Sequence, residues 1–272
     1  MGHLIRMIKQ QQEGGIPPDD VVAVHNPHGT GRVVLVCEHA SNVVPEKFND
    51  LGLSPSALQS HIGWDIGALA VAEALSARLD APLIAHRVSR LVFDCNRSPD
   101  AVDSIVEVSE YDAVPGNMGL SPADRAQRAA HYYTPFCDAL SACVEQRIAV
   151  CPPSADLPVL ITVHSFSPVY KDESRFVEIG ILHGSDARLA NEILGCVGED
   201  GKFSAMRNVP YGPQDGVTFT LEHHAIAHGL LNVMIEIRND LIADAEGQQA
   251  MAEALSHYIT CALTTLQGAS QS

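Results

Sequence analysis

The feature that most constrains the fold of this chain is a series of short apolar runs rich in β-branched residues. Residues 33–37 read VVLVC, residues 159–163 read VLITV, and residues 230–237 read LLNVMIEI. Short runs that are apolar at consecutive positions are typical of strands buried on both faces of a sheet. The sequence therefore predicts a sheet that other elements cover on both sides.

Helical patterns separate these runs. Further strands are expected at 82–85, 91–95 and 177–182, and helices at 66–79, 122–150, 186–197, 218–228 and 248–266. Strands that alternate with helices indicate the α/β class. We predict a three-layer α/β/α sandwich around a mixed, mostly parallel sheet.

Composition excludes several classes of protein. The chain has 272 residues, of which 46% are hydrophobic and 18% charged, which argues against disorder. No stretch approaches the roughly 20 apolar residues of a membrane helix. Acidic residues exceed basic ones by 33 to 17, and the net charge of −16 argues against a nucleic-acid partner.

The expected organisation is a flexible leader at 1–30 followed by a single catalytic domain at 31–272. The first residues lack the apolar segment of a secretory signal. The seven cysteines form no CxxC pair, so we predict no disulfide framework and a reducing, cytoplasmic location. No sequence feature indicates an oligomeric state.

Polar residues interrupt or follow four of the expected strands. His39 follows 33–37, Asn96 and Arg97 follow 91–95, His164 follows 159–163, and Glu236 lies near the end of 230–237. Ligands of open α/β sheets bind beyond the carboxyl ends of the strands. These residues are therefore expected to converge on one site.

This set of residues predicts a metal centre. A catalytic zinc takes three protein ligands, and neutral imidazole is a preferred one, so His39 and His164 are expected to supply two. Asp65 is the expected third ligand, with Glu38 and His61 as competitors. Zn²⁺ is the expected cofactor, although another divalent metal is compatible with such ligands.

The remaining residues predict an acid–base group and an anion site. Glu236 is expected to act as general base. Arg97, with Asn96, is expected to bind a substrate carboxylate, because guanidinium binds carboxylate in bidentate fashion. Arg90 and Arg238 are further cations for a second carboxylate or for a developing oxyanion.

Structural alternatives remain open for these residues. Asp65 is also a suitable N-cap for the helix that follows it. Glu236, inside an apolar run, is also a candidate for a structural ion pair with Arg238 or Arg97.

A rival histidine pair lies at His224 and His228, four positions apart on one helical face. Without the glutamate of an HExxH motif, this pair is a weak metal signal. We expect this helix to flank the pocket, with His224 touching substrate.

Five segments in order resemble the N-formylglutamate amidohydrolase family. They lie at 39–41, 63–65, 89–97, 163–165 and 235–238. The resemblance implies a phosphorylase/hydrolase-like fold, one zinc ion and hydrolysis of an N-acyl amino acid. It also implies that Asn96 and Arg97 hold the α-carboxylate, that Glu236 is the base, and that Ser165 lies at the substrate. One departure is Thr162, where the family pattern has an aspartate two residues before His164.

The leading functional hypothesis is a zinc-dependent amidohydrolase that releases formate from an N-formyl amino acid such as N-formyl-L-glutamate, a step of histidine degradation. Its expected partner is a small anionic substrate, with neither nucleic acid nor membrane. One alternative is a metallocarboxypeptidase or amidase acting on short peptides or cell-wall amides. Another is a non-catalytic small-molecule binding protein on the same fold.

Overall fold

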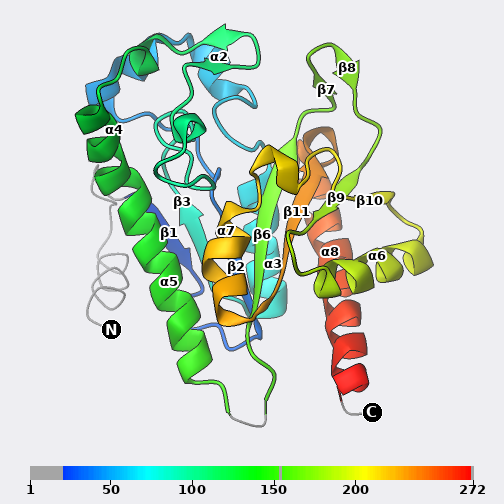
Figure 1. Cartoon of the computed structure of the whole chain (residues 1–272). Helices are drawn as coiled ribbons and strands as arrows, with labels where there is room; N and C mark the ends of the chain where they lie inside the picture. The colour runs from blue at the N-terminus through cyan, green and yellow to red at the C-terminus, as the bar shows by residue number, and fades with distance from the viewer. Residues whose placement is uncertain (1–20, 153–154, 271–272) are drawn as a thin grey trace.

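A seven-stranded sheet forms the centre of the molecule in the computed structural model, which describes residues 21–152 and 155–270 (Figure 1). The strand order is β1-β3-β2-β6-β11-β9-β10. The strands are β1 (Val22–His25), β2 (Val33–Cys37), β3 (Leu83–His86), β6 (Val159–Phe166), β9 (Ile179–Leu182), β10 (Ala205–Arg207) and β11 (Leu231–Arg238).

The four central strands β3, β2, β6 and β11 are parallel to one another. β1 pairs antiparallel with β3 at one edge, and β9 pairs antiparallel with β11 near the other. β10 is parallel to β9. The predicted mixed, mostly parallel sheet is confirmed, and the carboxyl ends of its central strands meet at one edge.

Helices cover both faces of the sheet, which confirms the three-layer α/β/α arrangement (Figure 1). Helices α3 (Ala68–Leu79), α6 (Arg188–Asp200) and α8 (Ala245–Ser270) pack on one face. Helices α5 (Thr134–Ala149) and α7 (Phe219–His224) pack on the other. Alternate residues of β2 point into the two cores, so all five of its side chains are buried, as the VVLVC run predicts.

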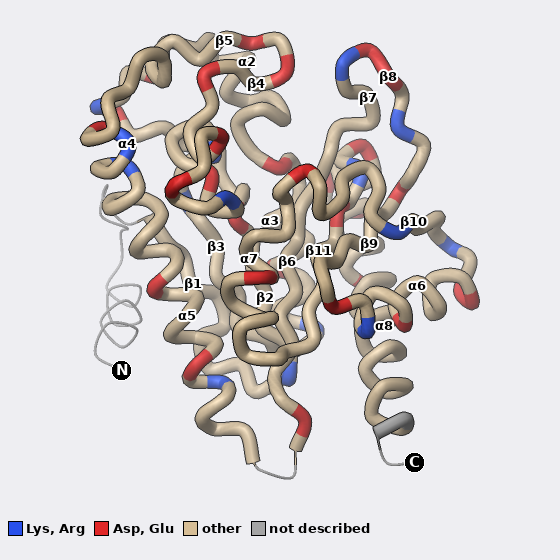
Figure 2. The backbone as a smooth tube through the Cα atoms, viewed as in Figure 1, with Lys and Arg blue, Asp and Glu red and all other residues tan. Residues whose placement is uncertain are grey.

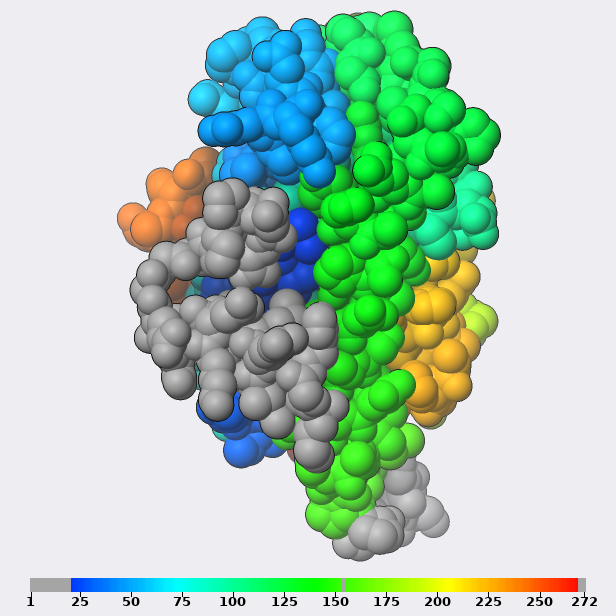
Figure 3. All heavy atoms as spheres, turned by 90° about the vertical axis from the view of Figure 1, so that its left-hand side faces the viewer, coloured from blue at the N-terminus to red at the C-terminus, as the bar shows by residue number. Residues whose placement is uncertain are grey.

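The helix expected at 122–150 is divided into three parts that run along one side of the molecule (Figure 3). Ser121 caps α4 (Pro122–Arg128), a π-helical turn covers Ala129–Tyr133, and α5 follows. Pro135 lies in the first turn of α5. Proline has no backbone N–H to donate to the preceding turn, which accounts for the interruption.

The remaining short elements lie mainly in the loops beyond the carboxyl ends of the central strands. They include α2 (Pro55–Gln59), the hairpin of β4 (Val108–Ser109) and β5 (Asp112–Ala113), and the hairpin of β7 (Val169–Tyr170) and β8 (Glu173–Ser174). Figure 2 shows several acidic positions on these hairpins.

The strand expected at 91–95 is absent, and this prediction was wrong. The segment forms turns, because Val92 N–H donates to Ser89 O and Arg97 N–H donates to Asp94 O. The Asp94 side chain accepts a hydrogen bond from Asn96 N–H. This aspartate therefore favours a turn in a run whose apolar residues alone suggest a strand.

The prediction of no disulfide was also wrong. Cys196 of α6 and Cys261 of α8 are bonded, with their Cα atoms 6.4 Å apart. The two helices pack against each other, and their sequence separation of 65 residues concealed the pairing.

Of the expected leader, residues 1–20 lie outside the described residues, whereas Val22–His25 form the edge strand β1. None of the described helices combines the length and the apolar character needed to cross a membrane.

Candidate metal centre and active site

A cavity of about 460 Å³ opens at the carboxyl ends of the central strands. Its wall combines strand ends with loops that lie far apart in the sequence. The charged and histidine residues in the wall are His39, His61, Asp65, Arg90, Asp94, Arg97, Asp103, Glu110, His164, Arg175, Asp215 and Glu236. The polar loop at 98–120 supplies part of this wall through the residues around its hairpin.

Three of the predicted ligands come together in this wall. Asp65 Oδ2 lies 2.9 Å from His164 Nδ1 and 3.3 Å from His39 Nδ1. Each of the three side chains is at most 4% exposed, and their ligand atoms lie within 4.8 Å of one another. Ligands of a tetrahedral zinc ion are roughly 3.3 Å apart at ordinary Zn–N and Zn–O distances. The donor atoms therefore fit a divalent cation of this kind.

The backbone places Asp65 for this role. Its N–H donates to the carbonyl of His39 over 2.9 Å, which ties the loop before α3 to the end of β2. The N-cap of α3 is Gly67, and the Asp65 side chain makes no capping hydrogen bond. The alternative interpretation of Asp65 as a helix cap was therefore wrong.

The outward ring nitrogens of both histidines face carboxylates. His39 Nε2 lies 2.8 Å from Asp94 Oδ1, and His164 Nε2 lies 3.0 Å from Glu38 Oε2. Carboxylates in this position orient a metal-binding imidazole and make it more basic. The family pattern has an aspartate at position 162, where this chain has a threonine. Here Glu38 provides the carboxylate that faces His164. It lies behind His164 and outside the cluster of three.

The charges of this cluster are unbalanced. Burial raises the pKa values of Glu38, Asp65 and Asp94, but neighbouring imidazoles, and Arg90 in the case of Asp94, outweigh it, so all three pKa values are lowered overall. Arg90 faces two of these carboxylates, with Nη2 2.8 Å from Asp94 Oδ2 and Nη1 3.5 Å from Asp65 Oδ1. Three buried carboxylates and one guanidinium leave a deficit of two positive charges.

The pKa values of the two histidines are raised by these carboxylates. Burial alone lowers the pKa of His164, but Glu38 and Asp65 raise it well above its ordinary value. Burial and Arg90 lower the pKa of His39, and Asp94 and Asp65 reverse the direction. Two protons on the imidazoles balance the charge, and so would one divalent cation with neutral imidazoles.

Glu236 lies on β11 directly beside His164 of β6 in the parallel register. Its side chain is 5% exposed, and burial raises its pKa to about 7. Oε2 has no hydrogen-bond partner among the described residues. The alternative ion pair is not formed, because Arg238 bonds Asp240 and Arg97 bonds Asp103. A buried carboxyl group with this pKa is suited to accept and return a proton near neutral pH.

Asn96 and Arg97 lie in the cavity wall, but both are engaged with the protein. Asn96 Nδ2 donates to Val217 O over 2.7 Å, and Asn96 Oδ1 accepts from the N–H and hydroxyl of Thr220. Arg97 donates to Asp103 Oδ2 over 2.8 Å and to Gly216 O over 3.0 Å. The two residues thus anchor α7 and the loop before it.

The other predicted site residues are dispersed. Ser165 lines the cavity, and its hydroxyl donates to Ile66 O. His61 also lines the cavity, with Nε2 2.8 Å from Glu110 Oε2, and lies outside the cluster of three. Arg238 and His224 are not part of the cavity wall.

Sequence reasoning missed Arg175 and Tyr211, which complete one side of the wall. Arg175 Nη1 donates to the Tyr211 hydroxyl over 3.0 Å. Its guanidinium lies 4.5 Å from the Tyr170 ring centroid and 4.9 Å from that of Tyr211. No carboxylate within the described part of the chain pairs with Arg175. Its only sequence signal was one basic residue in a polar loop.

The model of the N-formylglutamate amidohydrolase family matches residues 31–243. The chain belongs to this family. The match confirms the resemblance noted in the sequence and identifies the chain as a member of an amidohydrolase family with a His–Asp–His candidate metal site.

The solved structures that resemble this N-formylglutamate amidohydrolase family member include the following two. Gene product Atu2144 from Agrobacterium tumefaciens is 46% identical, with a TM-score of 0.87, over 94% of this chain and 98% of that chain. An N-formylglutamate amidohydrolase from Ralstonia eutropha JMP134 is 19% identical, with a TM-score of 0.68, over 91% of this chain and 99% of that one. The second likeness shows a shared fold. No curated protein matches the chain.

Proposed function

We propose that this protein hydrolyses the amide bond of an N-acyl amino acid, with an N-formyl amino acid such as N-formyl-L-glutamate as the leading candidate. The observation that carries the proposal is the position of Glu236 beside the His39–Asp65–His164 cluster in one cavity wall. Membership of the amidohydrolase family supports the reaction class. A cytoplasmic role in amino-acid degradation, including that of histidine, belongs to the same proposal.

His39, Asp65 and His164 would hold the metal ion, for which we propose Zn²⁺. Such an ion, when bound, lowers the pKa of a water molecule and polarises a carbonyl group. Asp94 hydrogen-bonds the outward nitrogen of His39 and Glu38 lies 3.0 Å from that of His164, while Nδ1 of each ring faces the Asp65 carboxylate.

Glu236 would move the proton. Because burial places its pKa at about 7, a large fraction is ionised at neutral pH. The unpartnered Oε2 accepts a proton from the attacking water and returns it to the departing amide nitrogen. This transfer converts the amine into a better leaving group without a second acid.

Two guanidinium groups in the wall would bind the substrate anion. Arg175 has no carboxylate partner among the described residues, and its guanidinium contacts two tyrosine rings. Arg97 is fixed by Asp103 and the carbonyl of Gly216. An N-acyl acidic amino acid carries two carboxylates, of which Arg175 would bind one and Arg97 would bind the other in exchange for Asp103.

The variant Glu236→Gln tests the proposal. It removes the proton acceptor and keeps the shape, so we expect formate release from N-formyl-L-glutamate to fall by about 10²- to 10⁴-fold. Metal content and melting temperature are expected to stay at the wild-type values.

Glu253→Gln, on the exposed side of α8, is the matched control and should retain full turnover. Near-wild-type formate release by Glu236→Gln would contradict the assigned role of Glu236.

A further inference from the structure

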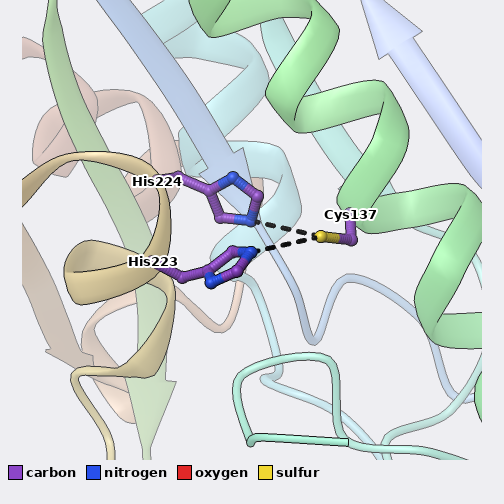
Figure 4. A group of neighbouring side chains, drawn as sticks. All are labelled: Cys137, His223 and His224. Atoms are coloured by element: carbon purple, nitrogen blue, oxygen red, sulfur yellow. Dashed lines mark hydrogen bonds between the residues drawn. The ribbon is translucent and has the colours of Figure 1, made fainter. Parts of the chain in front are cut away.

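A second group of potential metal ligands lies on α5 and α7, the two helices that cover the face of the sheet opposite α3, α6 and α8. Cys137 belongs to α5, and His223 and His224 are the last two residues of α7 (Figure 4). Cys137 Sγ lies 3.7 Å from His223 Nε2 and 3.8 Å from His224 Nε2. The three ligand atoms lie within 4.8 Å of one another.

The spacing of these atoms is that of a metal site. With Zn–S near 2.3 Å and Zn–N near 2.0–2.1 Å, a tetrahedral ion separates sulfur from nitrogen by about 3.6 Å. The two measured S···N distances exceed this value by little. Both Nε2 atoms point toward the same sulfur atom (Figure 4). The side chains therefore need only small movements to bind one ion.

Neighbouring groups hold both imidazoles in this orientation. The Ser141 hydroxyl lies 3.3 Å from His224 Nδ1, which leaves Nε2 to face Cys137. Phe219 stacks on His223 with centroids 5.5 Å apart and an interplanar angle of 15°. Contacts of this kind fix the ring orientation of metal-binding histidines.

The donor atoms and the solvent exposure of these side chains indicate which metal ion would bind. One thiolate and two imidazoles favour Zn²⁺ and other thiophilic ions over the hard cations Mg²⁺ and Ca²⁺. His223 is exposed and Cys137 is half-buried, so an ion reaches the group from solvent. Binding would release the thiol proton of Cys137 to solvent.

We propose that Cys137, His223 and His224 bind a thiophilic divalent cation such as Zn²⁺, separate from the ion of the candidate active site. The ion would cross-link α5 to α7. At its other end, α7 carries Thr220, which donates two hydrogen bonds to Asn96 in the cavity wall. The cross-link would therefore stabilise the helix that adjoins the cavity.

Titration of the metal-free protein with Co²⁺ tests this proposal. A sulfur ligand gives bound cobalt a near-ultraviolet charge-transfer band, and the His39–Asp65–His164 cluster contains no sulfur. We expect wild-type protein to bind two equivalents and to show the band. Cys137→Ser should bind one equivalent and lose the band, and His223→Ala should also lose it.

Cys151→Ser is the matched control, because Cys151 is also half-buried, its sulfur contacts backbone carbonyl oxygens, and it belongs to neither group of potential metal ligands in the described residues. This variant should keep the band. Absence of the band from wild-type protein in excess Co²⁺ would overturn the proposal, as would its persistence in Cys137→Ser or its loss in Cys151→Ser. Circular dichroism of each variant identifies any misfolded sample.

Discussion

The two histidine-containing clusters of this protein differ in what surrounds them. In the His39–Asp65–His164 cluster, every side chain is nearly inaccessible, and carboxylates occupy the outward nitrogen of each histidine. In the Cys137–His223–His224 cluster, one histidine is exposed, and the identified partner of the other is a neutral hydroxyl. The first cluster lies at the carboxyl edge of the sheet, on β6 and on loops, and the second lies on covering helices.

This difference teaches what each cluster can do. Buried carboxylates create a deficit of positive charge that a divalent cation relieves, and the adjacent cavity admits a substrate. The outer cluster carries no such charge and is not part of that cavity wall. These differences support the proposed catalytic role of the buried cluster and the proposed structural role of the outer one.

The largest expected difference between the clusters is the loss of metal affinity when the side chain that contacts a histidine on its far side is changed. Glu38→Gln removes the charge behind His164 while it keeps an acceptor, so we expect metal affinity at the buried cluster to fall by about 10- to 100-fold. Competition with a chelator measures this affinity.

Ser141→Ala is the corresponding change at the outer cluster and the matched control. A neutral hydrogen bond contributes about 0.5–1.5 kcal/mol, which corresponds to a roughly two- to tenfold loss of affinity there. If Glu38→Gln and Ser141→Ala lowered metal affinity by the same factor, each at its own cluster, the proposed difference between the two clusters would be contradicted.

A smaller effect is expected from Arg175→Met, which tests whether the cavity beside the buried cluster receives an anion. Loss of a charge-assisted hydrogen bond should raise KM for N-formyl-L-glutamate by about tenfold, which is the lower end of the roughly 1.5–3 kcal/mol that such a bond contributes, because Arg175 is partly exposed to solvent. The kcat value and the metal content should change little, because the arginine holds substrate before and during the reaction.

Steady-state kinetics measure this effect. Arg188→Met is the matched control, because Arg188, the first residue of α6, pairs with Asp186 and is not part of the cavity wall. An unchanged KM for Arg175→Met would exclude Arg175 from anion binding.

The sequence predicted the sheet and the buried cluster because both depend on local patterns. Consecutive β-branched residues identified β2, β6 and β11, and a polar residue at a strand end identified His39 and His164. Parallel strands bring such residues to one edge, so their convergence followed from topology.

Other features depended on contacts between distant segments. Asp94 made residues 91–95 a turn through hydrogen bonds that the apolar pattern does not reveal. Cys137 faces His224 across 87 positions of sequence. The pair His224 and His228, a weak metal signal in the sequence, does not share one helix, because α7 ends at His224 and a 3₁₀ turn carries His228. Exact helix ends are set by packing and capping rather than by periodicity.

The most direct test of the central claim is formate release from N-formyl-L-glutamate by one preparation in three states. It is measured as purified, after chelation, and after stepwise return of Zn²⁺, with bound metal counted at each step. The account predicts that release is lost with the metal and restored by the returned ion. Release that persists in metal-free protein would contradict it, as would no release from protein that holds the ion, tested with N-formyl-L-glutamate and a panel of other N-acyl amino acids.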